Sequence, residues 1–449
     1  MAIEHVAIIG GGFSGALQAI NLLRHEGPRA TLIERRAEAA RGVAYSAAHP
    51  DHLLNVRAGN MSALPQEPNH FARWLQQRHP ELADGFAPRL IFGDYLAELL
   101  DDAHQAAPER LRILRGEATD VIPDGEGWRI CLDDGQVIAA DAVILAPGNL
   151  PPHIPGGIDV DALPAGCFAP EPWSGDVAEG LGPEDTVLVI GSGLTMIDIA
   201  LLLDARGFQG RIVAISRRGL SPRAHEAVAP STLDMRPPTT AVQLLRHVRS
   251  RSRDVGWRAA VDELRPYTEG LWTAATLAER HRFLRHLRAW WDVHRHRIAP
   301  EVAARIGAMQ AAGRLEIVAG KLLEVDAEAP GARVRYRPRS QEEIATLHVR
   351  RIINATGPQG DLLRTEEPLL RRMLARGLIR PDPLRIGIDV TQQSEVVDAN
   401  GEAHPTLLAL GPMTRGTFWE IVAVPDIRRQ TWAVARKLSN AHWVGGEGL

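Results

Sequence analysis

The segment Val6-Ala7-Ile8-Ile9-Gly10-Gly11-Gly12-Phe13-Ser14-Gly15 joins an apolar strand to a helix through a run of glycines, and it decides the fold of this 449-residue chain. Gly10 allows a tight turn out of the strand, and Gly12 allows backbone N–H groups to approach a pyrophosphate. Gly15 allows the helix to pack close to the sheet. A pyrophosphate bound there lies at the positive N-terminus of the helix. The segment therefore predicts a dinucleotide site, which we call the first grip.

An acidic residue supports this prediction. Glu34 ends the next apolar strand, Thr31-Leu32-Ile33. Its distance along the chain is roughly the 20 residues at which a carboxylate accepts hydrogen bonds from ribose hydroxyls. A carboxylate there repels a 2′-phosphate, so the first grip suits FAD or NAD. A glycine-rich loop alone also occurs as a plain turn, and it is the combination of strand, glycines, helix and acid that indicates a nucleotide.

A second segment of the same kind, Val187-Leu188-Val189-Ile190-Gly191-Ser192-Gly193, begins a second grip. Met196 stands where the third glycine would be, and no acid follows. The strand Ile212–Ile215 runs instead into Ser216-Arg217-Arg218. Because a guanidinium there can pair with a 2′-phosphate, this grip predicts NADPH. The alternative is that the two arginines are only a solvated strand end.

Composition limits the remaining possibilities. A chain of 449 residues suits two or three domains. The net charge of −4 argues against a nucleic-acid partner. The two cysteines, Cys131 and Cys167, form no CxxC pair, so we expect neither a metal site nor the redox dithiol of a disulfide reductase. No apolar stretch approaches the ~20 residues of a membrane span, and no leader precedes the first strand. We therefore expect a cytoplasmic protein with no membrane partner.

Two strand ends followed by small residues and proline, Ala146–Pro152 and Ile352–Pro358, fit crossovers between two domains. They predict an α/β fold with two Rossmann-like dinucleotide-binding domains, one inserted into the other. The outer FAD-binding domain would comprise residues 1–150 and 355–449, and the inner NAD(P)-binding domain residues 151–354. Residues from about 225 to 310 read as an additional helical insertion. The oligomeric state leaves no signal in the sequence.

The C-terminal part contains another glycine-rich segment. The buried strand Leu407–Leu410 is followed by Gly411–Glu420, which leads into the last helix. A helix N-terminus placed there would direct N–H groups at the anionic edge of a reduced flavin. The alternative is an ordinary loop between a strand and a helix.

The insertion carries an unusual row of cations. On a helix from about Glu279 to Ile298, 3–4 spacing predicts two faces. One face carries His281, Arg285, Arg288, Asp292 and Arg295, and the other Leu284, Leu287, Trp291, His294 and Ile298. Guanidiniums beside aromatic side chains suit a carboxylate or phosphate, so Arg285 and Arg288 are candidate substrate-binding residues. The alternative is a solvated helix face.

With these motifs the chain resembles the two-dinucleotide-binding flavoprotein superfamily, which includes flavin-containing monooxygenases and amino-acid N-hydroxylases. It is more closely similar to bacterial proteins known only as FAD/NAD(P)-binding proteins. The motifs of that likeness are Gly42–Tyr45, Leu53–Val56, Gly193–Thr195, Ser216–Gly219, Trp290–Arg297 and Trp419-Glu420. Aspartate N-hydroxylases are similar at this level. The resemblance covers essentially the whole chain but is poor at indicating a substrate.

The resemblance also implies site residues. It implies FAD at Gly10, Gly12, Gly15, Glu34 and the loop at Gly411, and NADPH at Gly191, Gly193, Ser216 and Arg217. The other residues expected at the cofactors are Phe13, Ser14, Gly148, Leu194, Thr195, Gly357 and Thr417. Asn60 is the catalytic candidate, in a loop that by this resemblance faces the flavin ring, with loop capping as its alternative role.

Three classes of function follow from these expectations. The favoured class is an FAD-dependent NAD(P)H oxidoreductase of the flavin monooxygenase type, N-hydroxylating or not. It would use O2 and a small, anionic metabolite. The second class is an NAD(P)H dehydrogenase that passes electrons to a quinone or a protein. The third is a non-catalytic flavin-binding protein.

Overall fold

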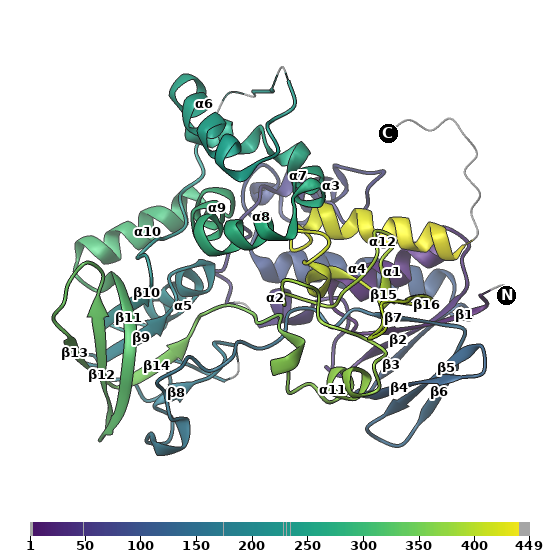
Figure 1. Cartoon of the computed structure of the whole chain (residues 1–449), viewed down its shortest axis with the longest axis horizontal. Helices are drawn as coiled ribbons and strands as arrows, with labels where there is room; N and C mark the ends of the chain where they lie inside the picture. Colours follow the sequence, from purple (N-terminus) through teal and green to yellow (C-terminus); the bar gives the residue numbers. More distant parts are fainter. Residues whose placement is uncertain are drawn as a thin grey trace.

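The structure is a computed structural model that describes residues 3–439, except positions 48, 174, 228, 230 and 234. Its strands form two large sheets and one small antiparallel sheet. The two large sheets occupy opposite halves of the molecule, and a group of helices lies above the region between them (Figure 1). No helix in the described part of the chain is long and apolar enough to cross a membrane.

The first large sheet has the strand order β15-β16-β7-β1-β2-β3, and every pairing in it is parallel except β15 with β16. Its strands are β1 (His5–Ile9), β2 (Arg29–Glu34), β3 (Leu111–Arg115), β7 (Ala142–Leu145), β15 (Glu395–Val397) and β16 (Ala403–Ala409). Parallel strands are buried on both faces, which is why β1 is apolar along nearly its whole length. Val6 and Ile8 face one core cluster, and Ala7 and Ile9 face another.

Two different layers cover this sheet. On one face lie α1 (Phe13–Arg24), α4 (Arg89–Ala106), α12 (Val424–Leu438) and the shorter α3 (His70–Arg78). On the other lie α11 (Pro368–Ala375) and the small sheet of β4 (Ala118–Asp124), β5 (Gly127–Leu132) and β6 (Val137–Ala140). The short helix α2 (Gly42–Ser46) packs against α4. The C-terminal helix α12 thus returns to the N-terminal strand and helix, as Figure 1 shows.

The second large sheet has the order β13-β12-β11-β10-β9-β14-β8. Its strands are β8 (Phe168–Ala169), β9 (Thr186–Ile190), β10 (Arg211–Ser216), β11 (Leu315–Glu328), β12 (Gly331–Pro338), β13 (Ala345–Val349) and β14 (Arg351–Asn354). The pairings from β8 to β11 are parallel, and β12 and β13 add an antiparallel edge. The helices α5 (Leu194–Ala205) and α10 (Pro300–Ala311) cover one face.

These sheets confirm the α/β class with two parallel, Rossmann-like units. The described strands of the first sheet come from residues 5–145 and 395–409, and those of the second from residues 168–354. The domain limits at residues 150 and 355 stay a prediction.

The insertion contains several helices, and the stretch expected to be one helix, from about Glu279 to Ile298, is interrupted. The insertion consists of α6 (Ala241–Asp262), α7 (Thr268–Ala274), α8 (Leu277–Arg282), a π-helical turn (Phe283–Leu287) and α9 (Arg288–Arg295). The helix predicted from Glu279 to Ile298 is therefore wrong in its regularity and in its end. A π turn has i→i+5 hydrogen bonds, so it shifts the side chains that follow it to another direction. Of the five charged residues expected on one face, Arg288 and Asp292 do contact each other as an i,i+4 pair, whereas Arg295 contacts Glu420.

Candidate functional site

The first grip closes on the crossover that follows β7. Gly10 has φ +99° and its N–H donates to the carbonyl of Ile33 at 2.9 Å. A Cβ on Gly10 would lie 2.2 Å from the carbonyl oxygen of Ala146, so no side chain fits. A Cβ on Gly15 would lie 1.8 Å from the carbonyl oxygen of Gly10. The two glycines therefore bring strand, helix and crossover into direct backbone contact.

Glu34 lies beneath this turn. Its side chain is 8% exposed, and its Oε2 accepts the N–H of Gly11 at 2.7 Å while Oε1 accepts the N–H of Arg36 at 2.8 Å. Each carboxylate oxygen can accept two hydrogen bonds, so capacity remains for ribose hydroxyls. The backbone thus holds the carboxylate at the end of β2, where the motif requires it.

The second grip repeats this arrangement. Gly191 has φ +121°, its N–H donates to the carbonyl of Ile215 at 2.8 Å, and a Cβ on it would lie 2.2 Å from the carbonyl oxygen of Ala355. The crossovers also match, because Gly148 and Gly357 both have positive φ, and a Cβ on either would meet no atom within 4 Å in the described structure. In both halves of the chain, the first glycine of the grip therefore packs in the same way against the backbone of the crossover.

The helix that follows the second grip differs from α1. Met196 is fully buried in the core between α5 and the second sheet. It fills the place where the first grip has Gly15. The N-terminus of α5 is nevertheless open, because no described atom lies within 4 Å of the position that a Cβ on Gly193 would take.

The two arginines after β10 have different surroundings. Arg218 donates from Nη1 to the carbonyl of His286 at 2.9 Å and from Nη2 to that of Arg285 at 3.3 Å, so it holds the insertion. Arg217 is exposed and makes no hydrogen bond or ion pair within the described part of the chain. Ser216 Oγ accepts the N–H of Gly219 at 3.0 Å. Of the two guanidiniums, that of Arg217 is free to bind a ligand.

A cleft of about 560 Å³ lies between the two grips. This is within the range of small-molecule sites. The predicted residues that line it are Gly10, Gly12, Phe13, Ser14, Glu34, Gly148, Leu194, Thr195 and Gly357. Those outside its lining are Gly15, Asn60, Gly191, Gly193, Ser216, Arg217, Arg285, Arg288, Gly411 and Thr417. Both N-terminal helix turns, of α1 and of α5, therefore open into one cavity.

The cleft suits a dinucleotide on three observations. The N-terminus of α1 has no side-chain cap, so its N–H groups are open to a ligand. A Cβ on Gly12 would lie 3.4 Å from the Cα of Gly42, an ordinary van der Waals distance. Packing within the protein therefore does not require a glycine at this position. Glu34 lines the same cleft. This is the donor and acceptor set that the pyrophosphate and the ribose of FAD require.

The C-terminal loop reaches the first grip. A Cβ on Gly411 would lie 2.4 Å from Ser14 Oγ, and the Gly411 N–H donates to Gln430 Oε1 at 2.9 Å. The last helix, α12, begins at Val424 and not within Gly411–Glu420, whose first residues form a 3₁₀ turn. The segment thus leads into the last helix, as expected, and Gln430 accepts the Gly411 N–H; a role of Gly411 at FAD stays a prediction.

Two further candidates lie away from the cleft. Thr417 donates its Oγ1 hydrogen to the carbonyl of Val390 at 2.9 Å. Asn60 is exposed in a short 3₁₀ turn, Ala58–Asn60. Their roles at a cofactor stay predictions.

Sequence reasoning missed an ion pair that crosses the cleft. Arg89, at the start of α4, lies 2.9 Å from Asp198 of α5 and also donates to the carbonyl of Leu53 at 3.2 Å. Both Arg89 and Asp198 line the cleft. The pair therefore joins the two nucleotide-binding halves, and its members are too far apart in sequence for any motif to reveal it.

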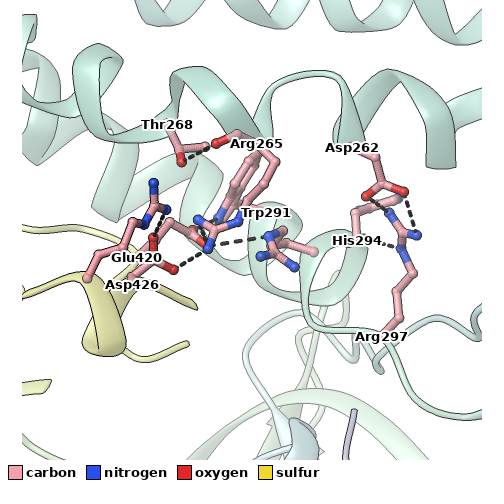
Figure 2. Close-up of polar contacts among 10 residues, drawn as sticks. Asp262, Arg265, Thr268, Trp291, His294, Arg297, Glu420 and Asp426 are labelled. Carbon is pink, nitrogen blue, oxygen red and sulfur yellow. Dashed lines mark hydrogen bonds and ion pairs between the residues drawn. The ribbon is translucent and has the colours of Figure 1, made fainter. Parts of the chain in front are cut away.

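The insertion is held over the C-terminal loop by Glu420, which is 5% exposed (Figure 2). Trp291 Nε1 donates to Glu420 Oε1 at 3.0 Å, and Oε2 lies 3.4 Å from Arg265 and 3.3 Å from Arg295. Arg295 therefore helps to hold the insertion against the C-terminal loop. By contrast Arg285 is exposed, and Arg288 lies 3.4 Å from Asp292.

Comparisons with known proteins agree with this geometry. Residues 7–150 match the family described as FAD-NAD(P)-binding. The chain is 38% identical over 136 residues to L-aspartate N-monooxygenase (nitrosuccinate-forming) of Streptomyces cremeus, an alignment that covers 27% of this chain and 20% of that enzyme. The chain thus aligns with about a fifth of the length of that curated relative.

Solved structures match over nearly the full length. An ornithine N-hydroxylase of Kutzneria sp. 744 superposes with a TM-score of 0.66 at 16% identity, covering 98% of this chain and 100% of that one. A cadaverine monooxygenase of Erwinia amylovora gives 0.69 at 14% identity, covering 98% and 95%. At such identities the likeness concerns the fold. Residues 7–150 match the FAD-NAD(P)-binding family, and the whole chain shares the fold of these two solved enzymes.

Proposed function

We propose that the protein is an FAD-dependent NADPH oxidoreductase of the monooxygenase type, which N-hydroxylates a small amine with O2 as co-substrate. The observation that carries the proposal is the single cleft onto which both nucleotide grips open. The FAD-NAD(P)-binding match at residues 7–150 supports the cofactors. The N-monooxygenase aligned with part of the chain, and the N-hydroxylases that share its fold, support the reaction.

In this proposal each grip has its own task. The open N–H groups after Gly12 bind the FAD pyrophosphate, and Glu34 binds the ribose. The start of α5, at Leu194 and Thr195, binds the pyrophosphate of NADPH, and Arg217 binds its 2′-phosphate. When bound, the flavin accepts a hydride from the nicotinamide and supplies the electrons that reduce O2. The Arg89–Asp198 ion pair fixes the position of the two grips relative to each other across the cleft.

The cysteines support a monooxygenase over a disulfide reductase. Cys131 lies in β5 of the small sheet, and Cys167 lies next to β8 of the second large sheet, and both thiols are free. Burial raises the pKa of the Cys167 thiol, which keeps it protonated and unreactive. Electrons therefore have no dithiol to pass through, so a small diffusing acceptor is the simpler route. A cytoplasmic location stays a prediction.

The test uses purified protein loaded with FAD. Under anaerobic conditions NADPH should bleach the flavin absorbance. In air, L-aspartate, L-ornithine and cadaverine should be compared as substrates, with O2 uptake and hydroxylamine formation measured together. We expect one of these amines to give N-hydroxylated product in proportion to the NADPH oxidised.

Other results point to other functions. Rapid reduction of a quinone, with no amine oxidised, would indicate a dehydrogenase. A flavin that NADPH does not bleach would indicate a flavin-binding protein without this activity.

A further inference from the structure

The loop between the first grip and the insertion carries an arginine whose side chain makes no hydrogen bond or ion pair in the described structure. The loop begins at Gly411, against Ser14 of the first grip, and ends at Glu420, which holds the insertion. Arg415 lies directly after the 3₁₀ turn Gly411–Thr414. At about 2 Å of rise per residue, this turn places its backbone roughly 8 Å from Gly411. Arg415 therefore lies between the cofactor site and the insertion.

Arg415 is half-buried, and its guanidinium makes no hydrogen bond or ion pair within the described structure. Its Nε is inaccessible to solvent and has no hydrogen-bond acceptor. Its main contact is with the ring of Trp419, whose centroid is 4.3 Å from Cζ. Trp419 in turn stacks on Trp272, with ring centroids 4.7 Å apart. Both rings are buried, so the surface beneath the guanidinium is apolar. Burial, with a smaller effect of the nearby Arg288 charge, lowers the pKa of Arg415 to about 10, so it stays charged at neutral pH.

The neighbouring arginines are all engaged. Arg265 and Arg295 contact Glu420, and Arg288 contacts Asp292. The remaining contacts pair Arg297 with Asp262, and Arg280 with the carbonyls of Thr273 and Ala275. Of the two carboxylates whose charges act on Arg415, Glu420 contacts Arg265 and Arg295, and Asp292 contacts Arg288 through Oδ2 while its buried Oδ1 has no hydrogen-bond partner. The Nε of Arg415 is thus removed from solvent without an acceptor, which is unfavourable unless a ligand supplies one.

We propose that Arg415 binds a carboxylate group of the substrate. A planar guanidinium that rests on an indole presents its remaining N–H groups as a fork, and this geometry matches a carboxylate bidentately. The inference rests on the proposed function and narrows it, because it selects amino acids over simple amines such as cadaverine. It also moves the anion site from Arg285 and Arg288 of the insertion to the loop that adjoins the first grip.

The test measures binding and needs no turnover. FAD-loaded protein without NADPH is titrated by calorimetry with L-aspartate, L-lysine and cadaverine, the last of which is lysine without its carboxylate. We expect at least one of the amino acids to bind at millimolar concentration or below, and cadaverine to bind more weakly. Arg415→Gln should weaken amino-acid binding by about ten- to a hundredfold, the value of a charge-assisted contact. Its effect on cadaverine should be small.

Two further variants separate binding from structure. Arg415→Lys keeps the charge but loses the fork, so we expect an intermediate loss. Arg282→Gln removes an exposed cation of the insertion and should bind like the wild type. FAD content and anaerobic reduction by NADPH should be unchanged in all three variants. If the wild type does not bind FAD or is not reduced by NADPH, that result contradicts the proposed function and not this inference. Equal binding of lysine and cadaverine, no binding of either amino acid, or full affinity in Arg415→Gln would overturn the inference.

Discussion

The substitution Arg217→Glu tests how the second grip selects its nucleotide. Arg217 is exposed at the end of β10 and makes no polar contact within the described residues, so its guanidinium is free for the 2′-phosphate of NADPH. A glutamate there would repel that phosphate and could accept a hydrogen bond from the 2′-hydroxyl of NADH. The variant should therefore lose or invert the preference for NADPH.

The size of the effect follows from the contact that is lost. A hydrogen bond to a charged group contributes about 1.5–3 kcal/mol, and about 1.4 kcal/mol corresponds to a factor of ten. The wild type should therefore use NADPH about ten- to a hundredfold more efficiently than NADH. Because the phosphate contact is exposed, salt should reduce the preference.

Stopped-flow reduction of the bound flavin, under anaerobic conditions and with both nucleotides, measures this preference directly. Arg218→Gln is the matched control, since the Arg218 guanidinium donates to the carbonyls of Arg285 and His286. It should lower the thermal stability of the protein and leave the nucleotide preference intact. Equal wild-type rates with NADPH and NADH, or an Arg217→Glu variant that still prefers NADPH, would refute the assignment of Arg217.

Three other predictions concern the grips, the cysteines and one half-buried histidine. Gly12→Ala should abolish FAD retention without unfolding the protein, and Gly193→Ala should keep FAD but weaken NADPH binding. In both variants the added Cβ obstructs only the ligand. Flavin content and reduction kinetics measure the two effects. Cys131→Ser combined with Cys167→Ser should leave flavin reduction by NADPH nearly unchanged. Burial lowers the pKa of His296 to about 4, from an ordinary 6.5. The unfolded chain therefore binds a proton between these pH values that the folded chain does not, and stability should fall by up to about 3 kcal/mol as pH drops from 6.5 to 4. His296→Gln should flatten this dependence in urea unfolding.

Clear outcomes would contradict each of these. A yellow Gly12→Ala protein would show that the first grip does not hold FAD. Loss of flavin reduction in the folded double-serine protein would restore the disulfide reductase class. A wild type and a His296→Gln variant with equal pH dependence would mean that the imidazole is already hydrated in the folded state.

Much of the fold could be read locally. The apolar strands, the glycines at Gly10 and Gly191 and the acid at Glu34 all act through neighbours in their own supersecondary unit, so their spacing alone predicts two nucleotide grips. The crossovers were recognisable for the same reason. The structure adds why they match, since the carbonyls of Ala146 and Ala355 close on the two glycines in the same way.

The insertion could not be read in this way. Its periodic pattern suggested one regular helix, but a π turn at Phe283–Leu287 interrupts it. The i→i+5 hydrogen bonds of that turn change which side chains share a face, and no residue type in the sequence predicts such a turn. Of the expected row, Arg295 contacts Glu420 instead, and the substrate-binding role of Arg285 and Arg288 stays a prediction.

The sequence by itself determined two dinucleotide grips, their order and the charge that follows each, because these depend on residues within one strand-turn-helix unit. Only the tertiary structure decided which arginine is free. Arg217 and Arg218 are neighbours of the same type, and the insertion engages only Arg218. Arg415 is likewise set apart by what its surroundings leave unpaired. Partners of this kind come from segments distant in the chain, so their pairing exists only once the chain has folded.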